Sequence, residues 1–377
     1  MKICFWGNIA KAITGNTGGG GELQMALLAI ALAKGGHEVV IIDYGASEDF
    51  VTTDGIKIFK IKGWNDGIRM IRTFTHRLPQ LYRALKKQKA DVYYCRIRDF
   101  RHILAFRAAR KVKAKFVLGL ASDLDAMNFA SRLKFQLLVS PATLWSFFSG
   151  SLIEIVYPYL LRNADLVLVQ HQRQKDILSK KNIRSVVFFN IIEPTKSLAT
   201  QIQTSNYFIY VGSLDKRKGF VDLFNLIKKT PSLSYKVIGQ PRDRTARLYY
   251  EELKKIKNVT LSGRLSHSET IQEIANSKAL ISTSPMEGFP NIFIEAWASG
   301  IPVFSLYFDP CVIEKEKLGK VAHGNLDELI EMMKNNSTSE EFAIRAKSYV
   351  ENHHVLNSKK ICEINEIING LFKKEEK

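Results

Sequence analysis

Two stretches decide the fold: MKICFWG (residues 1–7) and TGGGGELQMALLAIALAKGGHEVVIIDYG (residues 17–45). The first is a short apolar run, as expected for a buried strand. The second contains a glycine-rich loop, a helix with an apolar face that ends at Gly35 and Gly36, and another apolar strand. A strand, a helix and a strand joined by tight glycine turns are typical of a parallel sheet. The amino terminus therefore predicts an α/β domain.

The same alternation continues along the chain. Further strands are expected at 92–96, 116–120 and 166–170, and in the second half at YFIYVGS, SYKVIGQ, NVTLSG and ALISTS, with helices between them. Since 377 residues are many for one core, we expect two domains. The polar, aperiodic stretch around Pro194 separates them. The expected division is 1–195, 196–355 and a carboxyl-terminal helix in 356–377, which could pack back on the first domain.

Composition indicates a globular protein, with 46% hydrophobic and 24% charged residues. The cysteines show no CxxC pair and no nearby histidines at metal-ligand spacing, so they read as reduced thiols in a cytosolic protein. They are Cys4, Cys95, Cys311 and Cys362. The first apolar run is too short for a signal peptide. We expect a cytoplasmic protein without a metal site.

The net charge of +18 is concentrated in the first half of the chain. Residues 1–200 contain 30 Lys and Arg against 15 Asp and Glu, and residues 57–115 contain 18 against three. Such a local excess predicts an anionic partner, either phosphates or a lipid surface. A nucleic-acid partner would also explain the charge, but no recognised RNA or DNA module is present.

Two segments between residues 57 and 162 favour a lipid surface. Residues 64–89 place apolar side chains near helical spacing among arginines and lysines, which suits attachment to an anionic membrane, although an ordinary amphipathic helix has the same pattern. Residues 135–153 carry no charge over nearly a membrane-spanning length, but serines, Gln136 and Pro141 dilute them. We expect a buried or interfacial helical insertion here, with a transmembrane helix as the weaker alternative.

The stretch SPMEGFPNIFIEAWASGIPV (residues 284–303) carries two acids, Glu287 and Glu295. Because proline is tolerated just before a helix, Pro290 should divide the stretch into a loop and a helix that ends at Gly300. Glu287 then lies on a loop at the carboxyl end of a strand, where open α/β sheets bind ligands, and Glu295 projects from the helix. The helix start suits a phosphate, and the carboxylates suit sugar hydroxyls. In the simpler alternative, Glu287 is a solvated loop residue and Glu295 only interacts with the helix dipole.

A basic turn stands at a corresponding position earlier in the chain. In VGSLDKRKGF, the side chains of Arg217 and Lys218 follow a strand and precede a helix, so they could stabilise the charge of a departing diphosphate. Taken alone, three consecutive cations more often form a solvated turn.

VGSLDKRKGF, VIGQ and EGFPNIFIEAWASGIPV, in this order, resemble the nucleotide-sugar half of the retaining glycosyltransferases of family 4, whose signature is Glu-x7-Glu. The resemblance covers most of residues 206–306. TGGGGE, GHEVVII and ADLVLVQ resemble the other half more weakly. The family implies a GT-B fold, in which two Rossmann-like domains with parallel sheets face an interdomain cleft.

The resemblance also implies roles for individual residues. Glu295 would hold the ribose hydroxyls, Glu287 would contact the transferred sugar, and Arg217 with Lys218 would neutralise the diphosphate without a metal. Backbone groups of the loop and of the helix start would help to hold the sugar and phosphate, namely those of Gly288, Phe289, Pro290, Asn291 and Ile292. Gly212 and Gly239, which follow neighbouring strands, would also belong to the donor-binding site. In the first half, Gly19, Gly20 and Gly21 would face the cleft, although flexible-turn glycines are an equal alternative.

The sequence departs from the family pattern at two positions. Ser213 follows Gly212 where arginine is common, so Arg217 should do more. Ser122 and Asp123 stand where a histidine is common, so Asp123 is a candidate for assisting the acceptor, although a helix N-cap is the commoner job of such an aspartate.

The expected function is therefore a metal-independent, retaining hexosyltransferase without a cofactor, peripheral on the inner face of the membrane. It would move a sugar from a nucleotide-diphosphate donor, with UDP favoured, to a hydroxyl of a lipid-linked glycan in cell-surface polysaccharide synthesis. A nucleotide-sugar epimerase of the same fold and a catalytically silent membrane scaffold remain alternatives. The residues do not identify the sugar, the acceptor, the linkage or the oligomeric state.

Overall fold

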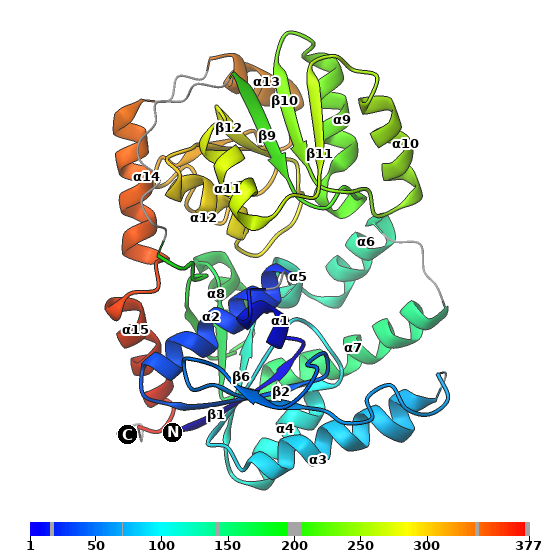
Figure 1. The fold of residues 1–377 in the computed structure, drawn as a ribbon, viewed down its shortest axis with the longest axis vertical. Coiled ribbons are helices and arrows are strands. Elements are labelled where there is room, and N and C mark those ends of the chain that lie inside the picture. The colour runs from blue at the N-terminus through cyan, green and yellow to red at the C-terminus, as the bar shows by residue number, and fades with distance from the viewer. Residues whose placement is uncertain (16–18, 70, 140–143, 195–205, 336–338, 374–377) are drawn as a thin grey trace.

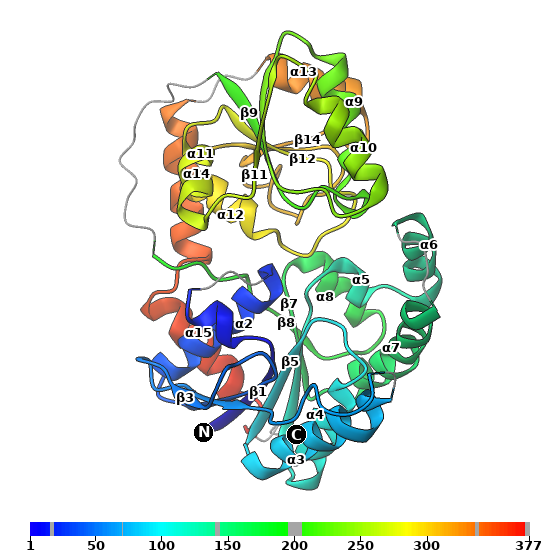
Figure 2. The same ribbon diagram turned by 45° about the vertical axis from the view of Figure 1, so that its right-hand side comes forward.

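The chain forms two α/β domains, each built on its own sheet, in a computed structural model (Figure 1). The structure describes residues 1–15, 19–69, 71–139, 144–194, 206–335 and 339–373. The carboxyl ends of the amino-terminal strands β1, β5 and β7 point toward the second domain (Figure 2). Segments that follow the strands of both sheets therefore meet between the domains.

The amino-terminal sheet has eight strands in the order β3-β4-β2-β1-β5-β6-β7-β8. All neighbours are parallel except β3 and β4. The parallel pairs follow from the predicted strand-helix-strand alternation, and the strands expected at 92–96, 116–120 and 166–170 are confirmed within one residue. The strands are β1 (Lys2–Gly7), β2 (Glu38–Asp43), β3 (Phe50–Val51), β4 (Lys57–Lys60), β5 (Val92–Arg96), β6 (Lys115–Gly119), β7 (Leu166–Val169) and β8 (Ser185–Val187).

Helices cover both faces of this sheet. Buried side chains of α2 and α15 pack on one face, and those of α3, α4, α7 and α8 pack on the other. The helices are α1 (Ala10–Ile13), α2 (Gly20–Lys34), η1 (Thr73–Arg77), α3 (Leu78–Gln88), α4 (His102–Lys111), α5 (Asp123–Ala126), α6 (Phe129–Val139), α7 (Leu144–Asn163), α8 (Gln172–Ser179) and α15 (Ser358–Asn369).

The carboxyl-terminal sheet has six parallel strands in the order β11-β10-β9-β12-β13-β14. Its two cores lie on opposite faces, one lined by α11, α12 and α14 and the other by α9, α10 and α13. The elements are β9 (Tyr207–Val211), η2 (Lys216–Lys218), α9 (Phe220–Lys229), β10 (Ser234–Ile238), α10 (Arg244–Leu253), β11 (Val259–Gly263), α11 (His267–Ala275), β12 (Ala279–Ser282), α12 (Asn291–Ala298), β13 (Val303–Ser305), β14 (Gly319–Val321), α13 (Leu326–Lys334) and α14 (Glu340–His353).

The chain passes between the domains twice, and the two passages lie side by side. Ile192 on the way out and Val355 on the way back form a parallel bridge, in which Ile192 N–H donates to the His354 carbonyl and Leu356 N–H donates to the Ile192 carbonyl. After the return, α15 packs on α2, and Ile364 and Ile368 are buried in the amino-terminal core. The last helix of the sequence thus completes the first domain.

The amphipathic helix expected over 64–89 is only partly correct. The helical structure begins at Arg72, with a π-helical turn over Thr73–Arg77 before α3, whereas the described residues 64–69 and Ile71 lie outside helices. The π-helical turn ends at Arg77, and Pro79 stands in the first turn of α3, where a missing N–H costs little. Trp64 is buried against Tyr44 instead of extending the helix, since their rings stack at 5.0 Å.

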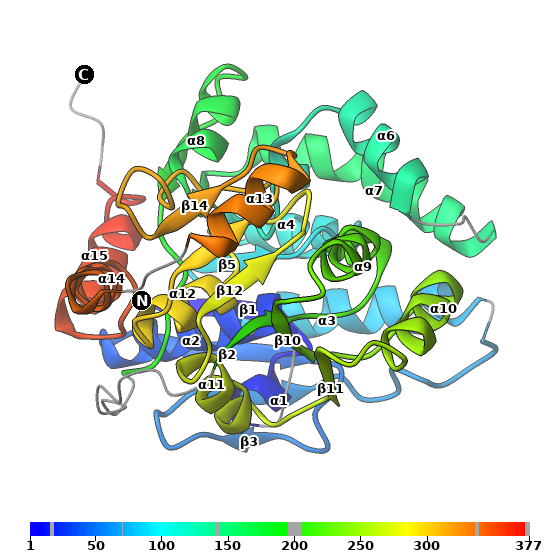
Figure 3. The ribbon, with the colours of Figure 1, turned by 90° about the horizontal axis from the view of Figure 1, so that it is seen from above.

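The uncharged segment 135–153 contributes to α6 and α7, so a helical insertion is present. Residues 140–143 and the side chains of 136–149 lie outside the described residues. In all three views, the start of α7 lies beside the turns that precede α3, on the side of the molecule opposite α14 and α15 (Figures 1–3). No helix in the described part of the chain is long and apolar enough to cross a membrane.

Replacing Ile364 with alanine should destabilise the protein, because Ile364 is fully buried between α15 and α2. Truncating a buried isoleucine costs about 2–5 kcal/mol. Urea denaturation followed by circular dichroism measures the loss. The matched control is Ile344→Ala on α14, where 63% exposure predicts a change within about 0.5 kcal/mol. Equal losses for both variants would show that α15 is not part of the amino-terminal core.

Candidate functional site

The loop and helix expected in residues 284–300 are present at the carboxyl end of β12. The helix α12 begins at Asn291, and Pro290 is its N-cap with φ of −64°. The helix ends before Gly300, whose φ of +76° is the left-handed conformation that closes helices. Proline thus separates the two acids: Glu287 lies on the loop and Glu295 lies on the helix.

Glu287 is paired with a lysine from the basic turn. Nζ of Lys218 lies 2.5 Å from Oε1 of Glu287, and the two side chains are 35% and 16% exposed. The turn itself is fixed to the same sheet edge, because Oγ1 of Thr283 donates to the Lys218 carbonyl at 3.1 Å. Two residues 69 positions apart therefore form one partly exposed ion pair beside the domain junction.

The carboxylate of Asp215 holds the basic turn in place by accepting three hydrogen bonds. It accepts hydrogen bonds from Ser213 Oγ at 3.0 Å, from Arg217 Nη2 at 2.9 Å and from the Lys218 amide at 3.2 Å. Burial raises the pKa of Asp215, but these hydrogen bonds outweigh the burial and hold the pKa below its ordinary value. Arg217 stays 57% exposed, so its guanidinium is available to an anion. Ser213, which departs from the family pattern, serves this anchoring network.

Glu295 is paired with a histidine that the sequence did not single out. Nε2 of His267, the first residue of α11, lies 3.0 Å from Oε1 of Glu295. The Glu295 side chain is 13% exposed, and that of His267 is 67% exposed. The hydrogen bond to Glu295 raises the pKa of His267 above its ordinary value. A hydroxyl ligand of Glu295 would compete with this imidazole.

Asn291 joins α12 to the amino-terminal domain. Its side-chain oxygen accepts from Gln24 Nε2 at 3.2 Å and from Asn190 Nδ2 at 3.0 Å. Its side-chain nitrogen lies 3.5 Å from the carbonyl of Gly20, the first residue of α2. The starts of α2 and α12 therefore lie together, and both present the positive ends of helix dipoles.

The three candidate glycines of the first domain stand at this contact. Gly19 is the N-cap of α2, and a Cβ on Gly20 would come within 3.3 Å of Asn291. A Cβ on Gly21 would meet Ile97 Cδ1 at 2.6 Å. Ile97 itself adopts a φ of +68°, a strained conformation for a β-branched residue. Gly20 thus permits a close approach to the second domain, whereas Gly21 makes room for Ile97 of its own domain.

Asn190 is the hub of the polar contacts between the domains. It is 4% exposed, and its side-chain nitrogen donates to the Phe289 carbonyl and to Asn291, while its side-chain oxygen accepts from two donors. These donors are Arg96 Nη2 at 3.0 Å and Gln170 Nε2 at 3.0 Å. The Asn190 carbonyl accepts from His354 Nδ1 at 2.8 Å, and burial lowers the pKa of His354 to about 3, so this imidazole is neutral.

Two further candidate glycines have structural reasons for lacking a side chain, whereas a Cβ on Gly212 would come no closer than 3.6 Å to Tyr210. A Cβ on Gly288 would lie 2.0 Å from Gln170 Oε1 and 2.4 Å from the Ala121 carbonyl, both in the other domain. A Cβ on Gly239 would lie 1.9 Å from the carbonyl oxygen of Gly212. Only glycine allows these backbone approaches. Gly288 therefore keeps the Glu287 loop against the amino-terminal domain.

The side chain of Phe289 points into the core rather than toward a ligand. It is 3% exposed and packs edge-on against Trp297 and Phe189. The side chain of Ile292 is half-buried against the same core. Any ligand contact of these residues would therefore come from their backbone.

Asp123 is not a helix N-cap. Ser122 is the N-cap of α5 and forms a capping box with Asp125. The Asp123 carboxylate is buried and lies 2.8 Å from His171 Nε2 and 2.9 Å from Gln174 Nε2. Its backbone N–H donates to the Glu287 carbonyl at 2.9 Å. The hydrogen-bond partners of the Asp123 carboxylate are thus His171 and Gln174 rather than a residue of the pair formed by Glu287 and Lys218.

Two arginines at the carboxyl end of β5 are functional candidates that motif reasoning missed: Arg96 is the last residue of the strand, and Arg98 follows it. Arg98 pairs with Glu154 of α7, and Arg132 of α6 pairs with the same carboxylate. The buried Nε atoms of Arg96 and Arg98 have no hydrogen-bond partner among the described residues. Their position at the carboxyl end of a parallel strand was the available signal.

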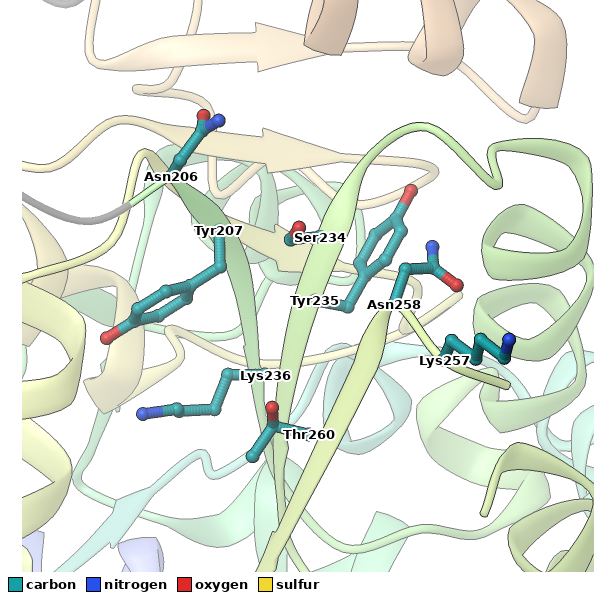
Figure 4. A pocket seen from close by; sticks show the side chains of 8 residues that line it. All are labelled: Asn206, Tyr207, Ser234, Tyr235, Lys236, Lys257, Asn258 and Thr260. Carbon is teal, nitrogen blue, oxygen red and sulfur yellow. The ribbon is translucent and has the colours of Figure 1, made fainter. Parts of the chain in front are cut away.

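A cavity of about 270 Å³ lies elsewhere (Figure 4). Its lining comes from the amino ends of β9, β10 and β11, including Tyr207, Lys236 and Asn258. The candidate acids stand at the opposite edge of the sheet, so this cavity is not part of the site. Within the described ranges, no group of three or more His, Cys, Asp or Glu is arranged to hold a metal ion.

The chain is similar to known proteins in sequence over part of its length and in fold over nearly all of it. Residues 194–348 match the model of the family described as glycosyl transferases group 1, and this region contains Arg217, Lys218, Glu287 and Glu295. No curated protein gave a significant sequence match.

Solved structures show the same fold. Sucrose-phosphate synthase from Thermosynechococcus elongatus is 15% identical with a TM-score of 0.75, and the match covers 99% of both chains. Anabaena HepE in complex with UDP is 15% identical with a TM-score of 0.65, covering 98% of this chain and 100% of that one. The lipopolysaccharide outer core galactosyltransferase WaaB is 20% identical with a TM-score of 0.64, covering 98% and 99%. The chain thus has the GT-B fold that the sequence predicted.

Nuclear magnetic resonance should show that His267 titrates above the ordinary histidine pKa, because its pair with Glu295 favours the protonated ring. Since the folded pKa is raised, this pair stabilises the fold below the ordinary value of 6.5, and the stabilisation is lost as the pH rises through the raised value. Glu295→Gln should return the titration toward 6.5.

The matched control is Glu314→Gln, which removes the carboxylate beside His323. It should leave the His267 titration unchanged. An unshifted His267 in the wild-type protein, or equal shifts in both variants, would contradict the pairing.

Proposed function

We propose that the protein is a retaining glycosyltransferase that uses a nucleotide-diphosphate sugar, with a UDP-sugar favoured. The observation that carries the proposal is the convergence of Glu287, Lys218 and Arg217 at one sheet edge, next to the adjacent starts of α2 and α12. The match of residues 194–348 to glycosyl transferases group 1 supports it. A solved neighbour that contains UDP supports the choice of nucleotide.

In the proposed reaction, the donor diphosphate lies between the basic turn and the helix starts. Arg217 and Lys218 stabilise the charge that develops as the bond between the sugar and the diphosphate breaks. The acceptor hydroxyl attacks on the same face, and its proton passes to the departing phosphate oxygen. Glu295 holds the ribose hydroxyls after they displace His267, and Glu287 orients the sugar while Lys218 moves to the phosphate. The two cations fill the electrostatic role that a metal has in other transferases.

The acceptor would bind to the amino-terminal domain. Arg96 and Arg98 offer buried donor groups near the junction, and the first half carries the excess of positive charge. These features favour an acceptor with an acidic group, which fits a lipid-linked glycan in cell-surface polysaccharide synthesis. WaaG, a solved neighbour with a TM-score of 0.66 at 14% identity, is described as a glycosyltransferase involved in lipopolysaccharide biosynthesis.

We also propose peripheral attachment to the inner face of an anionic membrane. Ile68, Ile71 and Phe74 are 69%, 49% and 48% exposed on the turns before α3, next to Arg69 and Arg72. The start of α7 lies beside these turns (Figure 2). On α6 and α7, large apolar side chains are exposed as well, namely Phe129, Leu133, Ile155 and Tyr159. Apolar side chains interleaved with cations suit an anionic bilayer surface.

Thermal-shift titration with UDP and a panel of nucleotide sugars tests the donor site. A bound donor raises the apparent stability according to its occupancy. Glu295→Gln should weaken binding about tenfold to a hundredfold, the effect of losing a hydrogen bond to a charged group. Glu251→Gln, which breaks an exposed pair with Lys254 in the same domain, is the control and should bind normally. Normal binding by Glu295→Gln would contradict the assignment.

Transfer is measured as incorporation of labelled sugar into an organic-solvent lipid fraction. Glu287→Gln should lower turnover about 100-fold or more, because a group that orients the reacting sugar is lost, while UDP binding persists. An altered sugar formed without acceptor would identify an epimerase instead. Donor binding with neither transfer nor hydrolysis would identify a catalytically silent scaffold.

Sedimentation with vesicles tests the membrane surface. The protein should pellet with vesicles rich in anionic lipid, less at high salt, and not with zwitterionic vesicles, because salt screens the attraction. The triple variant Ile68→Ser, Ile71→Ser, Phe74→Ser should bind at least tenfold more weakly. The control is Leu248→Ser, Ile344→Ser, which removes two exposed apolar side chains of the other domain. Equal sedimentation of both variants would reject this surface.

A further inference from the structure

Cys311 lies in a loop of fixed shape after β13. Its φ of +65° is a left-handed conformation, which few residues other than glycine adopt. Asp309 anchors the loop by accepting from the amides of Val312 at 2.9 Å and Ile313 at 3.0 Å. The direction of the Cys311 side chain is therefore set by the backbone, and the residue remains partly exposed.

This loop docks on the start of α8 in the other domain. Arg173 Nη2 donates to the Asp309 carbonyl at 2.6 Å, and the Arg173 guanidinium lies 5.6 Å from the centre of the Phe308 ring. The Phe308 ring also meets the His171 ring edge-on at 6.2 Å. The thiol of Cys311 interacts with the His171 imidazole and with the backbone N–H of Arg173.

The surroundings of His171 favour the protonated, positively charged imidazole. It is 1% exposed, and Nε2 donates to the buried carboxylate of Asp123 at 2.8 Å. Its other nitrogen, Nδ1, is buried and has no oxygen or nitrogen partner within the described residues, which leaves it to the thiol of Cys311. Burial lowers the pKa of His171, but the hydrogen bonds with Asp123 and Cys311 outweigh the burial and raise it.

The pKa of the Cys311 thiol is lowered, whereas that of His171 is raised. The hydrogen bond with His171 lowers the pKa of Cys311, and the Arg173 amide and guanidinium add to the effect. All four cysteines lie in the described residues, and the other three are shifted upward. Burial raises the pKa of Cys95 and raises that of Cys4 to about 12, while a hydrogen bond to Glu366 raises that of Cys362. Low thiolate pKa together with partial exposure is the environment of reactive cysteines.

We propose that Cys311, with His171 and Asp123, forms a reactive thiolate site that hydroperoxides oxidise. The thiolate sulfur attacks one peroxide oxygen, so that an S–O bond forms as the O–O bond breaks. Cys311 is oxidised to sulfenic acid, and the peroxide is reduced to hydroxide or alkoxide. The imidazolium of His171 supplies the proton that makes the leaving group neutral. A low-molecular-weight thiol restores the cysteine in two exchange steps.

Oxidation of Cys311 should affect the position of the Glu287 loop, because Asp123 contacts both His171 and that loop. The same Asp123 that holds His171 donates its backbone N–H to the Glu287 carbonyl. An oxygen added to the sulfur has to fit between His171 and the start of α8, which the thiol already contacts. This inference does not depend on the proposed transferase activity.

The experiment compares cysteines within the wild-type protein. The full chain is treated with hydrogen peroxide and a dimedone probe at several pH values, and each cysteine peptide is quantified by mass spectrometry. At neutral pH, Cys311 should label at least tenfold faster than Cys362, because an ordinary thiol with a pKa of about 8.5 is only a few per cent thiolate. In concentrated urea, the two rates should become equal.

Variants distinguish the effect of His171 on the labelling rate of Cys311 from the effect of solvent exposure. His171→Asn should raise the pH midpoint of Cys311 labelling and lower its rate at neutral pH about tenfold. Cys362→Ser, the matched control, should leave Cys311 labelling unchanged. The pH profile involves the groups around the thiol, which are His171, Asp123, Arg173 and Asp309. Equal rates for Cys311 and Cys362 in the folded wild-type protein would overturn the proposal, as would a Cys311 midpoint that is the same in His171→Asn.

Discussion

The side chain of Asn190 is the contact on which the arrangement of the two domains depends. A primary amide can donate two hydrogen bonds and accept two, and here all four are made inside the junction. One of them holds the loop that carries Glu287, and another holds the first residue of α12. Since a buried amide that lost any of these partners would have to remain unsatisfied, the network defines one relative position of the domains.

That position accounts for the residue types around the site. Gly288 has to be glycine because the first domain comes within van der Waals distance of its backbone. Gln24 donates to both Ile191 and Asn291, so it connects α2, the first passage between the domains and α12. The charged groups are then left at the margin of this packed polar centre. Arg217, Lys218 and His267 keep exposed side chains there, each with a carboxylate partner that a ligand could replace.

Local patterns in the sequence predicted the local structure. The glycine-rich start of α2 and the proline that begins α12 both depend on neighbouring residues, and both are present. The pattern at Asp123 gave the wrong cap, because Ser122 occupies the N-cap position and forms a capping box with Asp125. The helix expected from residue 64 was too long, since the apolar spacing that suggested it arises from a buried Trp64 and from exposed side chains on turns.

Contacts between distant residues were not predictable in the same way. Glu295 and His267 belong to different helices, and nothing in the sequence of either helix indicates the other as a partner. Likewise, the pattern of α15 shows an apolar face without showing which helix covers it. These pairings depend on the order of the strands and on the domain junction, which are properties of the whole fold.

The bridge between Ile192 and Val355 makes the second domain topologically an insertion in the first. Its chain enters and leaves at neighbouring points, and both described ends of the protein lie in the amino-terminal domain (Figure 1). Because the two described passages are hydrogen-bonded to each other, they offer one pivot for a rotation of the second domain relative to the first. The cost of such a rotation would come from the noncovalent contacts around Asn190.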